Sequence, residues 1–225
     1  MDLSKFEENI CYEFKNKELL KTALTHTSYA NEHKVQSNEK LEFLGDAILE
    51  FVTSEYLYNN YKNLKEGEMT KVRATVVCEE SLYKVAIKHN FSDFLIIGKS
   101  ELSCKGNEKP AILADSVEAV IAAMFLDSGL EHVKEFVIEN LKDSIEIASK
   151  NVGKKDYKTV LQEELQKNGT VHIEYNIIKE EGPDHSKVFT AEVRCNNKQL
   201  AIGTGSNKKQ AEMEAASKAL KDMKK

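Results

Sequence analysis

The chain has 225 residues, of which 41% are hydrophobic, and a formal net charge of −5. This is enough apolar material for one large domain or two modest ones, and it excludes global disorder. The longest uninterrupted apolar run, residues 119–126, is too short to span a bilayer, and the polar start of the chain has no signal-peptide pattern. We therefore expect a soluble, cytoplasmic protein with no membrane partner.

The charge is divided unevenly along the chain. Residues 154–225 contain 14 basic and 11 acidic side chains, a net of +3, which leaves 18 basic and 26 acidic, a net of −8, for residues 1–153. This asymmetry predicts an acidic body followed by a mildly basic part with a different electrostatic role. The four cysteines lack C-x-x-C spacing and nearby histidines, so we expect free thiols rather than a zinc site.

Apolar residues at helical spacing predict that residues 1–148 are all-α. The expected elements are short helices within 4–30, a helix from Ser37 or Asn38 to about Tyr61, a turn at 63–67, a helix from Glu68 to about His89, a polar loop at 98–109, a helix from Pro110 to about Asp127, and a last helix from Leu130 to about Ser149.

Residues 149–156 are almost free of apolar side chains and predict a linker. Beyond it the pattern changes to a helix at 157–167, three alternating runs typical of strands at 171–179, 187–195 and 198–204, and a closing helix at 207–223. Asn196 and Asn197 predict a hairpin turn. The predicted fold class is multidomain: an all-α domain at 1–148 and a small α+β domain, α-β-β-β-α, at 157–225.

Acidic residues recur on the helix that begins near Asn38. Glu39, Glu42, Asp46 and Glu50 fall on one narrow side, while the rest of the circumference is largely apolar, a pattern typical of a buried helix. A second pair, Asp115 and Glu118, shares one face of an alanine-rich helix, and small side chains allow helices to approach closely. If the two helices pack together, Glu42, Asp46, Asp115 and Glu118 converge.

Converging carboxylates can share protons at raised pKa values or bind a hard divalent cation. Oxygen ligands without His or Cys favour Mg²⁺, with Mn²⁺ as a substitute, over Zn²⁺. The same acids can instead form buried ion pairs, for which Arg73 is a candidate partner. Periodicity alone leaves the metal site and the ion pairs open.

Four motifs together resemble the ribonuclease III family. They are NEKLEFLGDA at 38–47, HTSY at 26–29, EGEMTKVRA at 66–74 and ADSVEA at 114–119, in the family's order. The resemblance implies that Glu42, Asp46, Asp115 and Glu118 bind Mg²⁺ and that Asp46 and Glu118 are catalytic. It also implies that Glu39 and Glu66 line the substrate cleft at a dimer interface. All six acidic positions are intact.

Residues 157–225 resemble a double-stranded RNA-binding domain through YKTVLQE at 157–163, GPDHSKVF at 182–189 and GTGSNKKQAE at 203–212. Such domains recognise the shape, 2′-hydroxyls and phosphates of A-form RNA. The residues implied to bind RNA are Thr159, Gln162, Glu163, Gln166, His185, Asn207, Lys208 and Lys209. The chain departs from the family where Asn207 replaces a commoner Ser and where Val171-His172 lacks a frequent Pro.

The resemblance implies a Mg²⁺-dependent endoribonuclease that cleaves both strands of double-stranded RNA, leaves 5′-phosphate and 3′-hydroxyl ends, and processes rRNA precursors and structured mRNA. It implies a homodimer and no organic cofactor. The alternatives are a non-catalytic double-stranded RNA-binding regulator and a metal-dependent phosphoesterase acting on small nucleotides.

Overall fold

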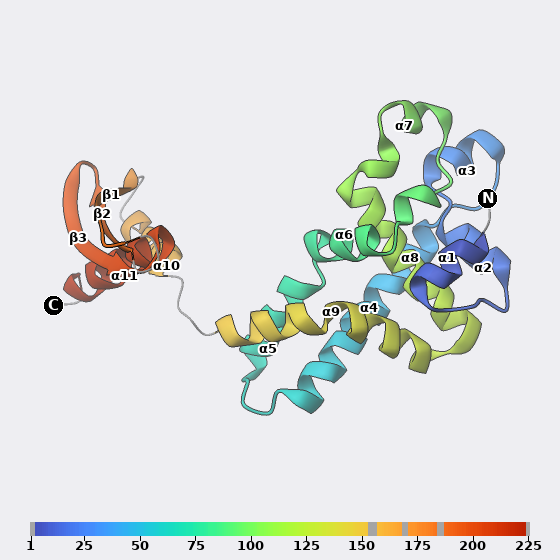
Figure 1. The fold of residues 1–225 in the computed structure, drawn as a ribbon, viewed down its shortest axis with the longest axis horizontal. Coiled ribbons are helices and arrows are strands. Elements are labelled where there is room, and N and C mark those ends of the chain that lie inside the picture. Colours follow the sequence, from blue (N-terminus) through green and yellow to red (C-terminus); the bar gives the residue numbers. More distant parts are fainter. Residues whose placement is uncertain (1–2, 153–156, 168–170, 184–186, 224–225) are drawn as a thin grey trace. The chain divides into compact units, whose positions relative to one another are not determined.

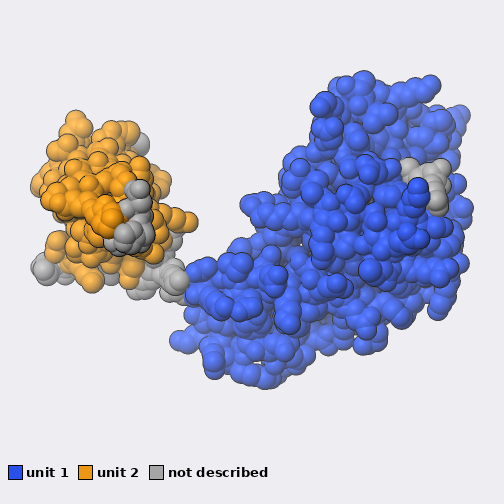
Figure 2. Space-filling view, viewed as in Figure 1, with its two compact units in different colours: residues 1–152 blue, residues 153–225 orange. Residues whose placement is uncertain are grey.

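The structure is a computed structural model that describes residues 3–152, 157–167, 171–183 and 187–223. The chain divides into two compact units, residues 1–152 and residues 153–225 (Figures 1 and 2). Among the described residues, no helix is long and apolar enough to cross a membrane.

The first unit is helical and the second is α+β, as the sequence predicts (Figure 1). The helices of the first unit are α1 (Leu3–Ile10), α2 (Lys17–Ala23), α3 (Thr27–His33), α4 (Glu39–Asn60), α5 (Glu66–Val76), α6 (Glu79–Lys88), α7 (Lys99–Ser103), α8 (Pro110–Ser128) and α9 (Leu130–Asn151), with short 3₁₀ turns η1 (Phe91–Asp93) and η2 (Gly106–Glu108).

Helix α8 is the centre of this unit. It packs against α2, α4, α6 and α9, and every residue from Ala119 to Met124 is buried. Pro110 occupies its first turn, where a missing N–H costs nothing. Its C-terminus ends at Gly129, whose φ of 84° suits a residue without a Cβ. A helix whose central turns are buried provides a fixed support for the acidic side chains that it carries.

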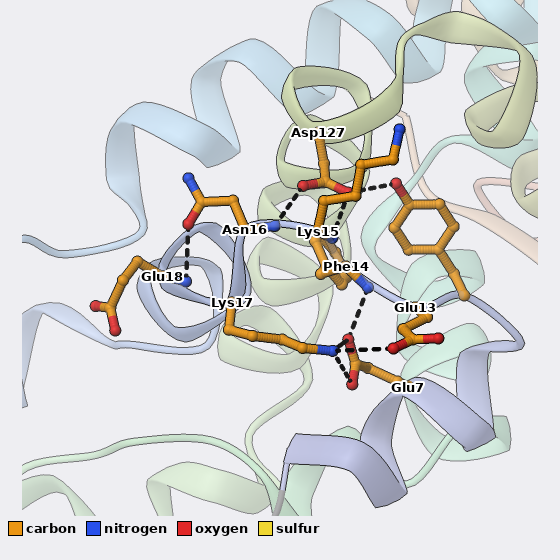
Figure 3. A network of polar contacts seen from close by, with 9 residues as sticks. Glu7, Glu13, Phe14, Lys15, Asn16, Lys17, Glu18 and Asp127 are labelled. Atoms are coloured by element: carbon orange, nitrogen blue, oxygen red, sulfur yellow. Dashed lines mark hydrogen bonds and ion pairs between the residues drawn. The ribbon is translucent and has the colours of Figure 1, made fainter.

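The N-terminal segment is fastened to the end of α8 by Asp127 (Figure 3). One carboxylate oxygen accepts from the Tyr12 hydroxyl at 2.7 Å and the Lys15 N–H at 3.0 Å, and the other accepts from the Asn16 N–H at 2.8 Å. Burial alone would raise the pKa of Asp127, but these donors outweigh it and lower the pKa. Burial, together with Asp127, raises the pKa of Tyr12 to about 12.

A second anchor lies beside the first. The side chain of Glu7 is buried, and its Oε1 accepts from the Phe14 N–H at 2.7 Å and from the Lys17 ammonium at 2.6 Å (Figure 3). Buried carboxylates need such partners, because an unpaired one is costly. The two anchors fix residues 12–17 between α1 and α8.

Three sequence predictions in this unit are wrong in detail. The helix expected from Glu68 to His89 is broken into α5 and α6, because Cys78 is extended (ψ 161°) and precedes the acidic first turn of α6. The polar loop expected at 98–109 contains α7 and η2. Helix α9 continues to Asn151, beyond its expected end.

The second unit contains α10 (Tyr157–Gln166), β1 (Ile173–Glu181), β2 (Val188–Cys195), β3 (Lys198–Gly205) and α11 (Lys208–Asp222). The strands form an antiparallel sheet in the order β1-β2-β3. The predicted turn joins β2 to β3, with φ values of 48° at Asn196 and 67° at Asn197. Helix α11 packs on the sheet and on α10 through a buried face formed by Ala211, Ala215, Ala216, Ala219 and Leu220.

Glycines in β3 allow α11 to lie directly on the sheet. A Cβ at Gly203 would stand 2.1 Å from the backbone nitrogen of Ala215, and one at Gly205 would stand 2.5 Å from that of Ala211. Both distances are far below any real contact. The Gly-x-Gly motif before α11 therefore has a packing role, which brings the start of α11 close to the sheet.

Candidate active site and nucleic-acid interface

The two acidic helices of the first unit touch through their backbones. A Cβ at Gly45 of α4 would lie 1.8 Å from the carbonyl oxygen of Glu118 in α8. Glu42 and Asp46 flank this glycine along α4, and Asp115 lies one turn before Glu118 on α8. The predicted packing of the two helices is confirmed, and it is closer than any residue with a side chain would permit.

The site is less buried than the sequence pattern suggests. Glu42, Asp115 and Glu118 are half-buried, whereas Asp46 and Glu39 are exposed. The interpretation of α4 as a helix buried all round is wrong, because its apolar residues do not all face the core. The Phe43 side chain is 83% exposed.

The acids share one electrostatic field. Burial, followed by the charges of Asp46, Asp115 and Glu42, raises the pKa of Glu118 to about 8. Burial raises the pKa of Glu42 as well, with contributions from Asp115, Glu39 and Asp46. The charged form of each of these carboxylates is therefore unfavourable in free energy, and a bound cation would offset that cost.

Asp115 has neighbours that the sequence did not suggest. Burial raises its pKa, the Glu79 carboxylate at the start of α6 adds to the increase, and His26 opposes it. His26 caps α3, where its Nδ1 accepts from the Ser28 N–H at 3.3 Å. The HTSY motif therefore lies near the acidic site.

No compensating cation is bound to this cluster by the protein itself. Across the described residues, no Lys, Arg or His forms a salt bridge with Glu42, Asp46, Asp115 or Glu118. Arg73 instead approaches Glu50 at 3.9 Å and donates to the Ser54 hydroxyl at 2.9 Å. The ion-pair alternative is therefore wrong for these four acids.

The donor chemistry fits a hard divalent cation, since it consists of carboxylate oxygens. In the part of the chain that the structure describes, no three His, Cys, Asp or Glu side chains already form a group tight enough to hold an ion.

The two predicted cleft acids lie in different places. Glu39 is exposed, accepts from the Ser37 hydroxyl at 3.0 Å and acts on the charge of Glu42. Glu66 accepts from the Thr70 hydroxyl at 3.1 Å and lines a pocket of about 240 Å³ between α4 and α5, together with Tyr58. Glu66 is not among the charges that raise the pKa values of Glu42, Asp115 and Glu118.

In the second unit, α10 and the start of α11 border a groove of about 890 Å³. The groove brings together five of the predicted RNA-binding residues: Thr159, Gln162, Gln166, Lys208 and Lys209. Glu163 is exposed on α10 but does not line the groove. His185 lies outside the described residues.

Asn207, predicted to bind RNA, also has a structural role as the cap of α11. Its side-chain oxygen accepts from the Gln210 N–H at 2.9 Å and caps α11, which places the N-terminal N–H groups of that helix beside Lys208 and Lys209.

One lysine at the groove was missed by sequence reasoning. Lys158 lines it, approaches Glu212 at 2.7 Å and lies 4.2 Å from the centre of the Tyr175 ring. A single lysine between Tyr157 and Thr159 at the start of α10 gave no sequence signal.

Each of the two units matches a known protein family. Residues 16–145 match the model of the Ribonuclease-III-like family, and residues 157–223 match that of the double-stranded RNA binding motif. The chain belongs to the ribonuclease III family. Membership makes it an endoribonuclease that acts on double-stranded RNA, and it confirms the predicted fold class.

Relatives named Ribonuclease 3 are similar over nearly the whole chain. The one from Clostridium kluyveri is 48% identical over 97% of this chain and 90% of its own length, and the one from Clostridium tetani is 46% identical over 99% and 95%. The solved nuclease domain of ribonuclease III from Campylobacter jejuni is 40% identical and aligns with a TM-score of 0.60, covering 64% of this chain and 98% of that domain. It is described as having structural flexibility in a region involved in dimer formation.

Proposed function

We propose that Glu42, Asp46, Asp115 and Glu118 bind Mg²⁺, which Mn²⁺ can replace, and that this centre hydrolyses phosphodiesters in both strands of duplex RNA. The observation that carries the proposal is the backbone contact at Gly45, which brings two acidic helices together. None of the salt bridges among the described residues involves the four acids. When bound, the metal supplies charge stabilisation and lowers the pKa of a water molecule.

The different burial of Glu118 and Asp46 suggests a different role for each residue. Glu118, which is half-buried and whose pKa is raised to about 8, would hold the cation through its carboxylate oxygens. Asp46 is exposed beside it and is placed to orient the attacking water. Water attack on the scissile phosphorus expels the 3′-oxygen, so products carry 5′-phosphate and 3′-hydroxyl ends.

The enzyme acts as a homodimer in this proposal. One chain has a single set of four acids, and cleaving two strands requires two sets. The exposed Phe43 side chain lies one residue from Glu42 and suits burial against a second copy of the chain. Glu39 and Glu66 then line the cleft formed by both chains, a role in positioning substrate or water.

The second unit holds the duplex. Thr159, Gln162, Glu163 and Gln166 on α10 hydrogen-bond 2′-hydroxyls in a minor groove, and Lys208 and Lys209 bind phosphates with the N-terminal N–H groups of α11. His185 enters the next minor groove. We further propose rRNA precursors and structured mRNA as cytoplasmic substrates.

The decisive experiment is cleavage of a long RNA duplex in Mg²⁺ and then in EDTA. Glu118→Gln is expected to abolish cleavage while duplex binding is retained. Glu131→Gln, the same change at an exposed residue of α9, is the control and should cleave normally. Persistent cleavage by Glu118→Gln would refute the assignment of Glu118, and cleavage by the wild type in EDTA would refute the metal centre.

A further inference from the structure

Two lysines in the second unit share one acidic partner. The Oε1 atom of Glu180, near the end of β1, lies 3.2 Å from the Lys208 ammonium, and its Oε2 atom lies 3.5 Å from the Lys187 ammonium. The lysines come from different segments, one from the start of α11 and the other from the residue before β2. A single carboxylate is thus held between two convergent cations.

An aromatic ring supports the same two lysines. The ammonium groups of Lys208 and Lys187 lie 5.9 Å and 6.0 Å from the centre of the Phe189 ring, within cation–π range. Since this ring does not depend on Glu180, it keeps the lysines near one another when the carboxylate moves away.

The position of the carboxylate is one that suits an RNA phosphate. A backbone phosphate, like a carboxylate, has two non-bridging oxygens, and each can accept a hydrogen bond from one ammonium group. Lys208 lines the groove beside α10, so its ammonium is engaged by Glu180 at the surface proposed to hold RNA. The two lysines lower the pKa of Glu180, Lys208 most strongly, as expected for a carboxylate between two ammonium groups.

We propose that Glu180 is an intramolecular competitor of the RNA backbone, occupying the phosphate position between Lys208 and Lys187 until a duplex displaces it. This inference rests on the proposed role of Lys208 in phosphate binding. Glu180 weakens duplex binding by the second unit and so favours release of cleaved product. Lys209 differs, because it has no ion-pair partner among the described residues and is free to make the first contact with phosphate.

The neighbouring residue provides a matched control. Glu181 is next to Glu180 on β1 and carries the same charge, but it pairs with Lys179 at 2.8 Å. Glu180→Gln and Glu181→Gln therefore change the net charge equally, and only the first releases Lys208.

The test measures binding of a fluorescent 20-base-pair RNA duplex (about two helical turns) to the full chain in EDTA by anisotropy. Glu180→Gln is expected to lower Kd about three- to fivefold, as the release of an exposed ion pair would. Glu181→Gln should change Kd by less than about twofold. In a Lys208→Gln background, adding Glu180→Gln should recover less than half of that gain. Equal effects of the two glutamine variants, weaker binding by Glu180→Gln, or an undiminished gain without Lys208 would each overturn the proposal.

A second measurement separates this inference from the proposed function. The carboxyl ¹³C resonance of Glu180 reports its pKa with and without saturating duplex, and displacement should return the lowered pKa toward its ordinary value. A pKa that stays low in the complex refutes the competition. If Lys208→Gln binds duplex as tightly as the wild type, the role of Lys208 itself is wrong, whatever the glutamine variants do.

Discussion

Gly45→Ala tests whether the close contact of α4 with α8 assembles the acidic site. The added methyl carbon would start 1.8 Å from the Glu118 carbonyl oxygen, while ordinary contacts begin at 3.4 Å. Both contacting groups are backbone, so no side chain can turn aside and the helices must separate. Overpacking of this kind costs up to about 3 kcal/mol, which lowers Tm by about 10 °C in a chain of this size.

The loss of activity should exceed the loss of stability. The separation moves Asp115 and Glu118 away from Glu42 and Asp46 as rigid pairs, and a misplacement of about 1 Å at a reacting centre can reduce the rate about 100-fold. Duplex cleavage is measured at 20 °C, where the variant remains folded by circular dichroism. Gly67→Ala is the control, because nothing lies within 4 Å of its added Cβ and alanine favours the helix. A Gly45→Ala protein with unchanged Tm and cleavage rate would refute the reasoning.

Three further outcomes are expected. Asp127→Asn leaves at least one of the donors to Asp127 without an acceptor and should cost about 2 kcal/mol at pH 7 in denaturant unfolding. Because the folded pKa of Asp127 lies below its usual 3.8, the wild-type advantage is present above that pH and should vanish as pH falls through the folded value; an advantage that persists in strong acid would contradict this. Metal-free Glu118→Gln should match the wild type in Tm at pH 4.5 and melt about 2–4 °C higher at pH 8.5. The Glu118 carboxyl has a pKa of about 8 in the folded protein and 4.5 in the unfolded chain, so its stabilising contribution is complete below pH 4.5 and is lost as pH rises through 8. Identical melting at both pH values would show that the raised pKa is wrong. Gly203→Ala should destabilise the second unit by about 3 kcal/mol in calorimetry and leave the transition of the helical unit unchanged, and a shift of both transitions would refute the independence of the two cores.

The sequence predicted the helices and strands well where the pattern was periodic, and it failed where a local signal interrupted a longer pattern. Met69, Val72 and Val76 continue into Leu82 and Val85 at helical spacing, which hides the break at Cys78. The acidic pair at Glu79 and Glu80, typical of a helix start, was the signal that could have revealed it.

The acidic site was predictable in composition but only partly in geometry. Carboxylates three or four residues apart must share a helix face, so Glu42 with Asp46 and Asp115 with Glu118 followed from spacing. The exposure of Phe43 did not, because a pattern of apolar residues does not distinguish those that face the core from those on the surface. Nor can periodicity place Glu66 relative to the four acids, because it begins a different helix, α5.

The burial of α8 also determines how this site can be lost. Amide hydrogens exchange with solvent most slowly in segments that open only with the whole domain, and α8, enclosed by four other helices, is such a segment. Asp115 and Glu118 are therefore attached to the part of the chain that is last to open. Heating should erase deuterium protection in α8 and inactivate the enzyme at the same temperature, while α7, a short helix without a buried residue, already exchanges freely.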